Sequence, residues 1–224
     1  MHVAPRRLDP SLLRLVVITD GRGDLVRLEQ VVAAALDGGA RCVQVREPHW
    51  SARMLMRACE RLLPLVERVR GVLLVNDRLD VAAARMAHGT QIGHKSLPPE
   101  VARDVVGIRS LLGYSAHDQQ ELDAAAVSCD FVLLSPVWAT TSKPGLPHLG
   151  VARAAQMTAL AKVPVVWLGG IGVEQAAQVA DLRGIRRPVG IAVRSAVLAA
   201  EDPAQAARSL LAALQGGGAA GAPA

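Results

Sequence analysis

Aromatic residues are scarce in this chain. One Phe, one Tyr and three Trp make up 2% of its 224 residues. Proteins that bind single-stranded nucleic acid usually stack bases on aromatic side chains, so this composition argues against such a surface. With so few aromatic residues, a core must be filled by Val, Leu, Ile and Ala. Hydrophobic residues reach 51%, which is enough for a large core and suits an α/β protein.

Cysteine is also rare, since only Cys42, Cys59 and Cys129 occur and no two of them have CxxC spacing. An odd number without such a motif indicates small buried hydrophobic residues in a reducing compartment. Apolar runs are too short to cross a bilayer. The first 14 residues hold four charged residues and two prolines, unlike a signal peptide. We therefore expect a cytoplasmic protein that does not bind membranes.

The charge balance is basic, with a net charge of +5 and a sequence pI of about 9.7. Such a balance suits nucleic acid, an anionic membrane or small anionic ligands as partners. The arginines are scattered rather than gathered in one run, and neither a helix-turn-helix nor an RNA-binding signature appears. We therefore expect a small phosphate as the partner, and no nucleic acid.

Short apolar stretches alternate with helical patterns along the chain, which predicts a parallel sheet. The predicted strands are residues 15–19, 42–46, 72–75, 90–92, 110–115, 131–134, 163–168 and 188–193. The predicted helices are residues 25–36, 51–69, 79–86, 98–105, 118–127, 151–160, 173–180 and 203–214, with a further helix opening at residue 194. Eight such short repeats favour a closed (β/α)8 TIM barrel over a doubly wound sheet. We expect one α/β domain over residues 15–215, an N-terminal extension over residues 1–14 and a disordered tail over residues 216–224.

Two adjacent glycines, Gly169 and Gly170, end the seventh predicted strand, and a helical pattern follows them. Because glycine lacks a Cβ, the backbone can turn sharply there and bring its N–H groups close to a ligand. Arg194 and Ser195 open a second turn of the same kind after the eighth strand. The last two loops of a (β/α)8 barrel often form a phosphate site at helix N-termini. One Gly-Gly pair alone would favour a plain tight turn, but with the second turn at this spacing we predict that these four residues bind phosphate.

Polar residues follow the other predicted strands, at the face of a barrel where catalytic residues collect. His117 follows the fifth strand, and histidine titrates near the pH at which a general acid or base must work. Helix capping or packing is the alternative role for this residue. Residues 135–150 form a long, polar, proline-rich connection that we interpret as a lid or a binding loop.

Six segments in this order and spacing resemble the thiamine phosphate synthase and TenI (thiazole tautomerase) superfamily. They are Ile18-Thr19-Asp20, Gln44-Val45-Arg46, Val75-Asn76-Asp77-Arg78, Gly113-Tyr114-Ser115-Ala116-His117, Thr140-Thr141-Ser142-Lys143 and Leu168-Gly169-Gly170-Ile171. The resemblance spans residues 15 to 200 and implies a TIM barrel that acts in thiamine biosynthesis on a thiazole phosphate. It also suggests a homodimer.

Two departures from the synthase pattern favour the tautomerase branch. The synthase resemblance implies a Mg²⁺ ion held by two carboxylates, one of which would be Asp77, but Ser96 stands where the second is expected. A hydroxyl is a poorer ligand for Mg²⁺ than a carboxylate. Glu47 stands where the synthase pattern has a lysine, whereas residues 142–150 resemble the tautomerase lid.

These departures predict a thiazole tautomerase-like isomerase that aromatises a thiazole phosphate carboxylate with His117 as general acid/base and without a cofactor. The first alternative is thiamine phosphate synthase, a Mg²⁺-dependent transferase that joins a pyrimidine pyrophosphate to a thiazole phosphate and releases pyrophosphate. The second is a non-catalytic binder of thiamine-related phosphates.

The remaining predicted site residues bind substrate. Arg46 can grip a carboxylate or phosphate through two parallel hydrogen bonds, and its alternative role is an ion pair with Glu47 or Asp77. Asp77 either binds Mg²⁺, orients Arg46 or caps the next helix. The other predicted substrate-binding residues are Gln44, Asn76, Thr140, Ser142 and Lys143.

Overall fold

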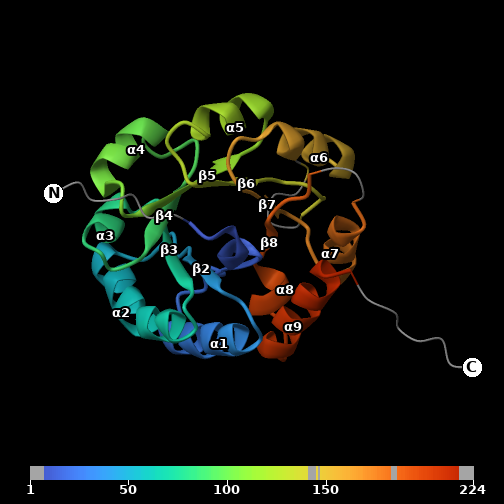
Figure 1. Cartoon of the computed structure of the whole chain (residues 1–224). Coiled ribbons are helices and arrows are strands. Elements are labelled where there is room, and N and C mark those ends of the chain that lie inside the picture. Colours follow the sequence, from blue (N-terminus) through green and yellow to red (C-terminus); the bar gives the residue numbers. More distant parts are fainter. Residues whose placement is uncertain (1–7, 141–144, 146, 183–185, 217–224) are drawn as a thin grey trace, which may run out of the picture.

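The computed structural model describes residues 8–140, 145, 147–182 and 186–216. Eight parallel strands pair in chain order and close into a barrel, with β8 pairing back onto β1. Helices ring the barrel on the outside (Figure 1). The strands are β1 (Leu15–Ile18), β2 (Cys42–Val45), β3 (Val72–Asn76), β4 (Gly89–Ile92), β5 (Leu111–Ala116), β6 (Phe131–Leu134), β7 (Val165–Leu168) and β8 (Gly190–Val193). The predicted (β/α)8 TIM barrel is confirmed.

Except for the short 3-10 helix η1, which the sequence did not predict, the helices follow the predicted pattern with bounds that differ by a few residues. The helices are η1 (Pro10–Leu13), α1 (Leu25–Asp37), α2 (Ala52–Arg68), α3 (Leu79–Ala83), α4 (Pro99–Val106), α5 (Gln119–Ala125), α6 (Val151–Leu160), α7 (Val173–Ala180), α8 (Ser195–Leu198) and α9 (Pro203–Leu214). The side chains of Asp24, Ser51, Asp118 and Asp202 accept backbone N–H groups at the starts of α1, α2, α5 and α9. Such caps satisfy donors that a helix leaves unpaired, so these four residues set where their helices begin.

The hydrophobic core has two layers, because successive strand residues point to opposite faces. One layer fills the barrel interior and includes Phe131, Leu133 and Val166, and the other packs between the strands and the helices. Trp167 belongs to the outer layer, where its indole Nε1 donates to Thr158 Oγ1 on α6 at 2.8 Å. Residues that face inward at the carboxyl end of each strand are therefore the ones that can line a site.

The amino-terminal end of the barrel is covered by residues 8–13. Leu13 of η1 is fully buried, and Leu8 and Leu12 pack against the interior core cluster. A Cβ at Gly190 would lie 2.0 Å from the Leu13 carbonyl oxygen, so only glycine lets this segment approach so closely. With this end covered by the chain itself, ligands have access from the carboxyl ends of the strands.

The three cysteines are free and buried. Burial raises the pKa of the Cys42 and Cys129 thiols to about 12 and that of Cys59 to about 11. Thiolate is the reactive form, so these residues are unreactive near neutral pH and act as small core residues. Within the described part of the chain, no helix is both long and apolar enough to span a bilayer.

Candidate active site

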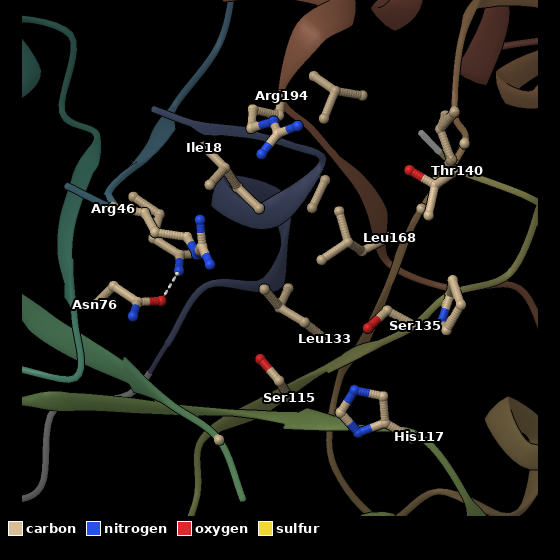
Figure 2. Close-up of a pocket in the computed structure, with 18 of the residues that line it drawn as sticks. Ile18, Arg46, Asn76, Ser115, His117, Leu133, Ser135, Thr140, Leu168 and Arg194 are labelled. Carbon is tan, nitrogen blue, oxygen red and sulfur yellow. Dashed lines mark hydrogen bonds between the residues drawn. The ribbon is translucent and has the colours of Figure 1, made fainter. Parts of the chain in front are cut away.

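A cavity of about 520 Å³ opens at the carboxyl ends of the strands. Figure 2 shows side chains from several strands pointing into it, with Arg46 and Asn76 on one side and Thr140 and His117 on another. Among the residues predicted from the sequence, ten line this cavity: Gln44, Arg46, Asn76, Asp77, His117, Thr140, Gly169, Gly170, Arg194 and Ser195. The two others, Ser142 and Lys143, lie outside the described residues. The fold therefore brings together, in one cavity, ten of the residues that the sequence predicted for the site.

The glycine turn after β7 has the conformation that glycine permits. Gly169 has a φ of 105° and Gly170 a φ of 66°, both in the left-handed region. A Cβ at Gly170 would lie 2.2 Å from the Ala139 carbonyl oxygen, and one at Gly169 would lie 2.8 Å from Pro136 Cβ. The turn therefore packs directly on the first residues of the β6–α6 connection. No acceptor among the described residues receives the Gly170 or Ile171 amide, which leaves these N–H groups for an anion.

The start of the β6–α6 connection is fixed to the same turn. The Val137 amide donates to the Leu168 carbonyl at 3.0 Å, and the Trp138 amide donates to the Gly169 carbonyl at 3.2 Å. The Trp138 and Trp167 rings meet edge to face with centroids 5.9 Å apart. The proposed lid over residues 135–150 thus begins from a rigid base, and its Thr140 lines the cavity.

A chain of hydrogen bonds crosses the opposite end of the cavity, from β2 to the loop after β4. Gln44 Nε2 donates to Asn76 Oδ1 at 2.7 Å, and Asn76 Nδ2 donates to Asp77 Oδ2 at 2.7 Å (the first bond is dashed in Figure 2). The Ser96 hydroxyl donates to Asp77 Oδ1 and accepts from the Gly93 amide at 3.1 Å. Asp77 is held in a left-handed conformation with a φ of 56°, which is uncommon for a residue with a Cβ. Each carboxylate oxygen of Asp77 therefore already has a partner within the protein.

The alternative role for Arg46, an internal ion pair, does not occur among the described residues. Both candidate carboxylates are engaged elsewhere, because Glu47 accepts from the Gly21 and Gly23 amides at 3.2 and 3.3 Å, while Asp77 bonds as described above. Glu47 is only 5% exposed, so it braces the β1–α1 loop instead of facing the cavity. The Arg46 side chain is exposed and lines the cavity, ready for an anion.

His117 sits where the sequence predicted, at the end of β5 and in the cavity wall. Its Nδ1 lies 3.0 Å from Glu121 Oε2, and the same oxygen accepts the His117 backbone amide at 2.7 Å. The ring of His94 meets the His117 ring nearly edge-on at a centroid distance of 5.9 Å. Glu121 thus orients the imidazole, whether that ring serves catalysis or the start of α5, and the catalytic assignment stays a prediction.

Ser115 and Lys95 are among the cavity residues that received no binding role from the sequence. Ser115 lines the cavity, and its Oγ accepts from Gln91 Nε2 at 3.0 Å. The alternation of side chains along β5 offered a clue, since Ser115 lies two residues before His117 and on the same face. Lys95 also lines the cavity, and its side chain has no ion-pair or hydrogen-bond partner among the described residues.

The described part of the cavity offers few ligands for the magnesium ion that the synthase resemblance implies. Within the described ranges there is no group of three or more His, Cys, Asp or Glu side chains placed to hold a metal ion. Asp77 supplies one carboxylate at the cavity, and Ser96 supplies a hydroxyl. Mg²⁺ often binds through one or two carboxylates together with substrate phosphates. These residues fit an ion that shares its ligands with a phosphorylated substrate, and Asp77 would be the residue that holds it.

Comparison with known families identifies the chain. The family model described as thiamine monophosphate synthase matches residues 15–197. The chain belongs to this family. A thiamine-phosphate synthase from Laribacter hongkongensis is 38% identical over 206 residues, which cover 92% of each chain. One from Thermobifida fusca is 38% identical over 209 residues, covering 92% of this chain and 93% of the relative.

One solved structure of a family member supports the same membership. The thiamine phosphate pyrophosphorylase from Pyrococcus furiosus matches with a TM-score of 0.81 and 31% identity, covering 92% of this chain and 97% of the other. A tryptophan synthase from Mycobacterium tuberculosis matches with a TM-score of 0.68 at 17% identity, which shows a shared fold alone. The predicted superfamily and its place in thiamine biosynthesis are confirmed.

The prediction of an isomerase that acts as a thiazole tautomerase is wrong. The similar relatives are thiamine-phosphate synthases, which are transferases, so the comparisons favour the first alternative. The error came from giving too much weight to Ser96 and Glu47. One carboxylate suffices when substrate phosphates complete the shell of Mg²⁺, and Glu47 has a structural role in the β1–α1 loop.

Proposed function

We propose that this protein is a thiamine phosphate synthase that transfers a pyrimidinylmethyl group from its diphosphate to the ring nitrogen of a thiazole phosphate. The supporting observation is that anion-binding groups from different parts of the barrel line the cavity. Gly169, Gly170 and Ser195 follow β7 and β8, whereas Arg46 follows β2 and Lys95 follows β4. A tautomerase handles one phosphorylated ligand, whereas a synthase must hold two at once, so two such sets of groups suit the transferase.

The reaction forms one bond and breaks one. The thiazole ring nitrogen attacks the methylene carbon of the pyrimidine substrate, and a C–N bond forms. The C–O bond between that carbon and the diphosphate breaks, and the diphosphate leaves with the bonding electron pair. Negative charge therefore grows on the leaving group, and fixed positive charge beside it stabilises the transition state. Magnesium bound together with the diphosphate would add Lewis-acid stabilisation there.

Different residues of the cavity would bind the thiazole phosphate and the diphosphate. The amides of Gly169 and Gly170, with Arg194 and Ser195 at the start of α8, would hold the thiazole phosphate. Arg46 would bind the diphosphate as a planar fork of donors.

The pyrimidine ring would then lie above the barrel interior. Gln44 and Asn76, which are hydrogen-bonded to each other, would contact it there. Thr140, Ser142 and Lys143, which the sequence predicts to bind substrate, would contact the diphosphate. Holding both substrates with the reacting atoms in line supplies much of the rate, because a bimolecular step becomes effectively intramolecular.

A transfer assay tests this function directly. Purified protein with pyrimidine diphosphate, thiazole phosphate and Mg²⁺ should yield thiamine phosphate and diphosphate in equal amounts, measured by chromatography and a coupled phosphate assay. Omitting either substrate should abolish both products. Absence of thiamine phosphate at saturating substrates and millimolar Mg²⁺ would rule out the proposal.

His117→Ala makes this assay more specific. The proposed transfer does not use the general acid/base role that the sequence predicts for His117. This variant should therefore keep its kcat within about tenfold of the wild type, below the hundredfold or larger loss typical of a missing general acid or base. A loss of a thousandfold would instead place His117 in the chemical step.

We further propose that the protein acts in the cytoplasm as a homodimer. Leu97, Val101, Val105 and Ile108, on and beside α4, are 46%, 41%, 47% and 53% exposed and recur every three or four residues. An exposed apolar row of this kind favours association.

Light scattering tests this dimer. The wild type should elute as a dimer, and a variant carrying both Val101→Glu and Val105→Glu should elute as a monomer. Val127→Glu is the matched control, because Val127 is an exposed valine outside this row. A monomeric wild type would contradict the proposal.

A further inference from the structure

The loop after β4 gives this chain an unusual cation site. Ser96 places a hydroxyl where a second carboxylate could stand, and this hydroxyl already makes two hydrogen bonds within the protein. It donates to Asp77 Oδ1 and accepts from the Gly93 amide. Asn76 occupies the other carboxylate oxygen of Asp77. A bare divalent ion would therefore compete with internal hydrogen bonds at both oxygens of Asp77 and would gain only one carboxylate ligand.

Lys95 adds a second obstacle for a bare cation. Its side chain is exposed, lines the same cavity as Asp77 and precedes Ser96 directly in the chain. Its ammonium has no carboxylate partner among the described residues to neutralise it. The charge of Lys95 repels a free divalent ion and attracts a diphosphate, whose charge outweighs that of the metal bound to it.

We infer that this protein binds its divalent cation only as a complex with a diphosphate ligand, with Asp77 as the carboxylate that receives the metal and Lys95 as a direct contact to the diphosphate. The inference rests on the proposed function for the identity of the diphosphate. It goes beyond that function because it sets an order of events: the protein without diphosphate stays metal-free, and metal arrives with the substrate. Ser96 is the residue that imposes this order.

Metal binding without any ligand provides the first test. Mn²⁺ is titrated into the wild type, Ser96→Asp and Ser96→Ala, and free Mn²⁺ is followed by electron paramagnetic resonance. The wild type and Ser96→Ala should bind weakly and alike. Ser96→Asp should bind at least about tenfold more tightly, because it restores a second carboxylate. Wild-type affinity equal to that of Ser96→Asp would overturn the inference.

Binding of inorganic pyrophosphate provides the second test. Calorimetry with the wild type should give at least about tenfold tighter binding in Mg²⁺ than in EDTA, as expected for a ligand that carries the metal. Asp77→Asn should lose this gain while still binding metal-free pyrophosphate, and Lys95→Ala should weaken binding in both conditions. Thermal melting of each variant verifies that it folds. Equal wild-type affinities in Mg²⁺ and EDTA would contradict the inference.

These measurements are independent of turnover. If the transfer assay gives no product while both binding tests give the expected results, the cation inference stands and the proposed reaction fails. If product forms but the wild type binds Mn²⁺ alone as tightly as Ser96→Asp, the reaction stands and the inference fails.

Discussion

Alanine at position 170 is expected to raise the KM for thiazole phosphate by at least about thirtyfold, comparable to losing a charge-assisted hydrogen bond of about 2 kcal/mol. Gly170 has a φ of 66°, and an added Cβ would lie 2.2 Å from the Ala139 carbonyl oxygen. The turn after β7 must then move away from the β6–α6 connection, and its amides move with it. Steady-state kinetics with thiazole phosphate as the varied substrate measure the effect.

Gly107→Ala is the matched control for this substitution. Gly107 has a φ of 72°, so alanine there suffers the same backbone strain, but nothing lies within 4 Å of the added Cβ. This variant should lose about 1 kcal/mol of stability in urea unfolding and keep the wild-type KM. If Gly170→Ala also keeps the wild-type KM, the turn does not bind the phosphate.

Replacing Asp77 with asparagine should lower kcat/KM for transfer by a hundredfold or more, equivalent to about 2.7 kcal/mol of transition-state stabilisation. The amide keeps the shape of the side chain but loses the charge, and with it the carboxylate ligand for Mg²⁺. The loss should shrink as Mg²⁺ is raised, because binding of the metal complex is what has weakened. Initial rates over a range of Mg²⁺ concentrations measure this.

Asp80→Asn serves as the control for a nearby carboxylate. Asp80 lies at the start of α3, where a hydrogen bond from Arg78 lowers the pKa of its carboxyl group. It does not line the cavity among the described residues, so its removal should leave kcat/KM within about twofold of the wild type. Similar losses in the two variants would indicate a general effect on the β3–α3 loop instead of a metal ligand.

The barrel could be predicted because the sequence patterns that specify its strands and helices are local. Each strand is a short apolar run. Turn glycines such as Gly169 mark where strands end, and capping residues such as Asp118 mark where helices begin. Strand alternation also placed Gln44 and Arg46 in the same cavity. The fold needed only this periodicity, because a closed parallel sheet brings all the strand ends to one face.

The reaction was mispredicted because it depends on contacts between distant loops. Sequence comparison exposed the replacement at Ser96 but not its hydrogen bond to Asp77, nineteen residues away. The sequence likewise could not show that Glu47 turns inward to the amides of Gly21 and Gly23, more than twenty residues earlier. The unexpected residue type at position 47 therefore does not change the chemistry, because the Glu47 side chain faces the β1–α1 loop instead of the cavity.

The edge-to-face pair of Trp138 and Trp167 gives the molecule an internal optical reporter. These are two of only three tryptophans in the chain, beside a single tyrosine. Trp138 is hydrogen-bonded through its amide to Gly169, so its indole is coupled to the place where we expect the thiazole phosphate. Two of the three indoles therefore lie beside the glycine turn, and we expect phosphate binding at that turn to change the intrinsic fluorescence of the unlabelled protein.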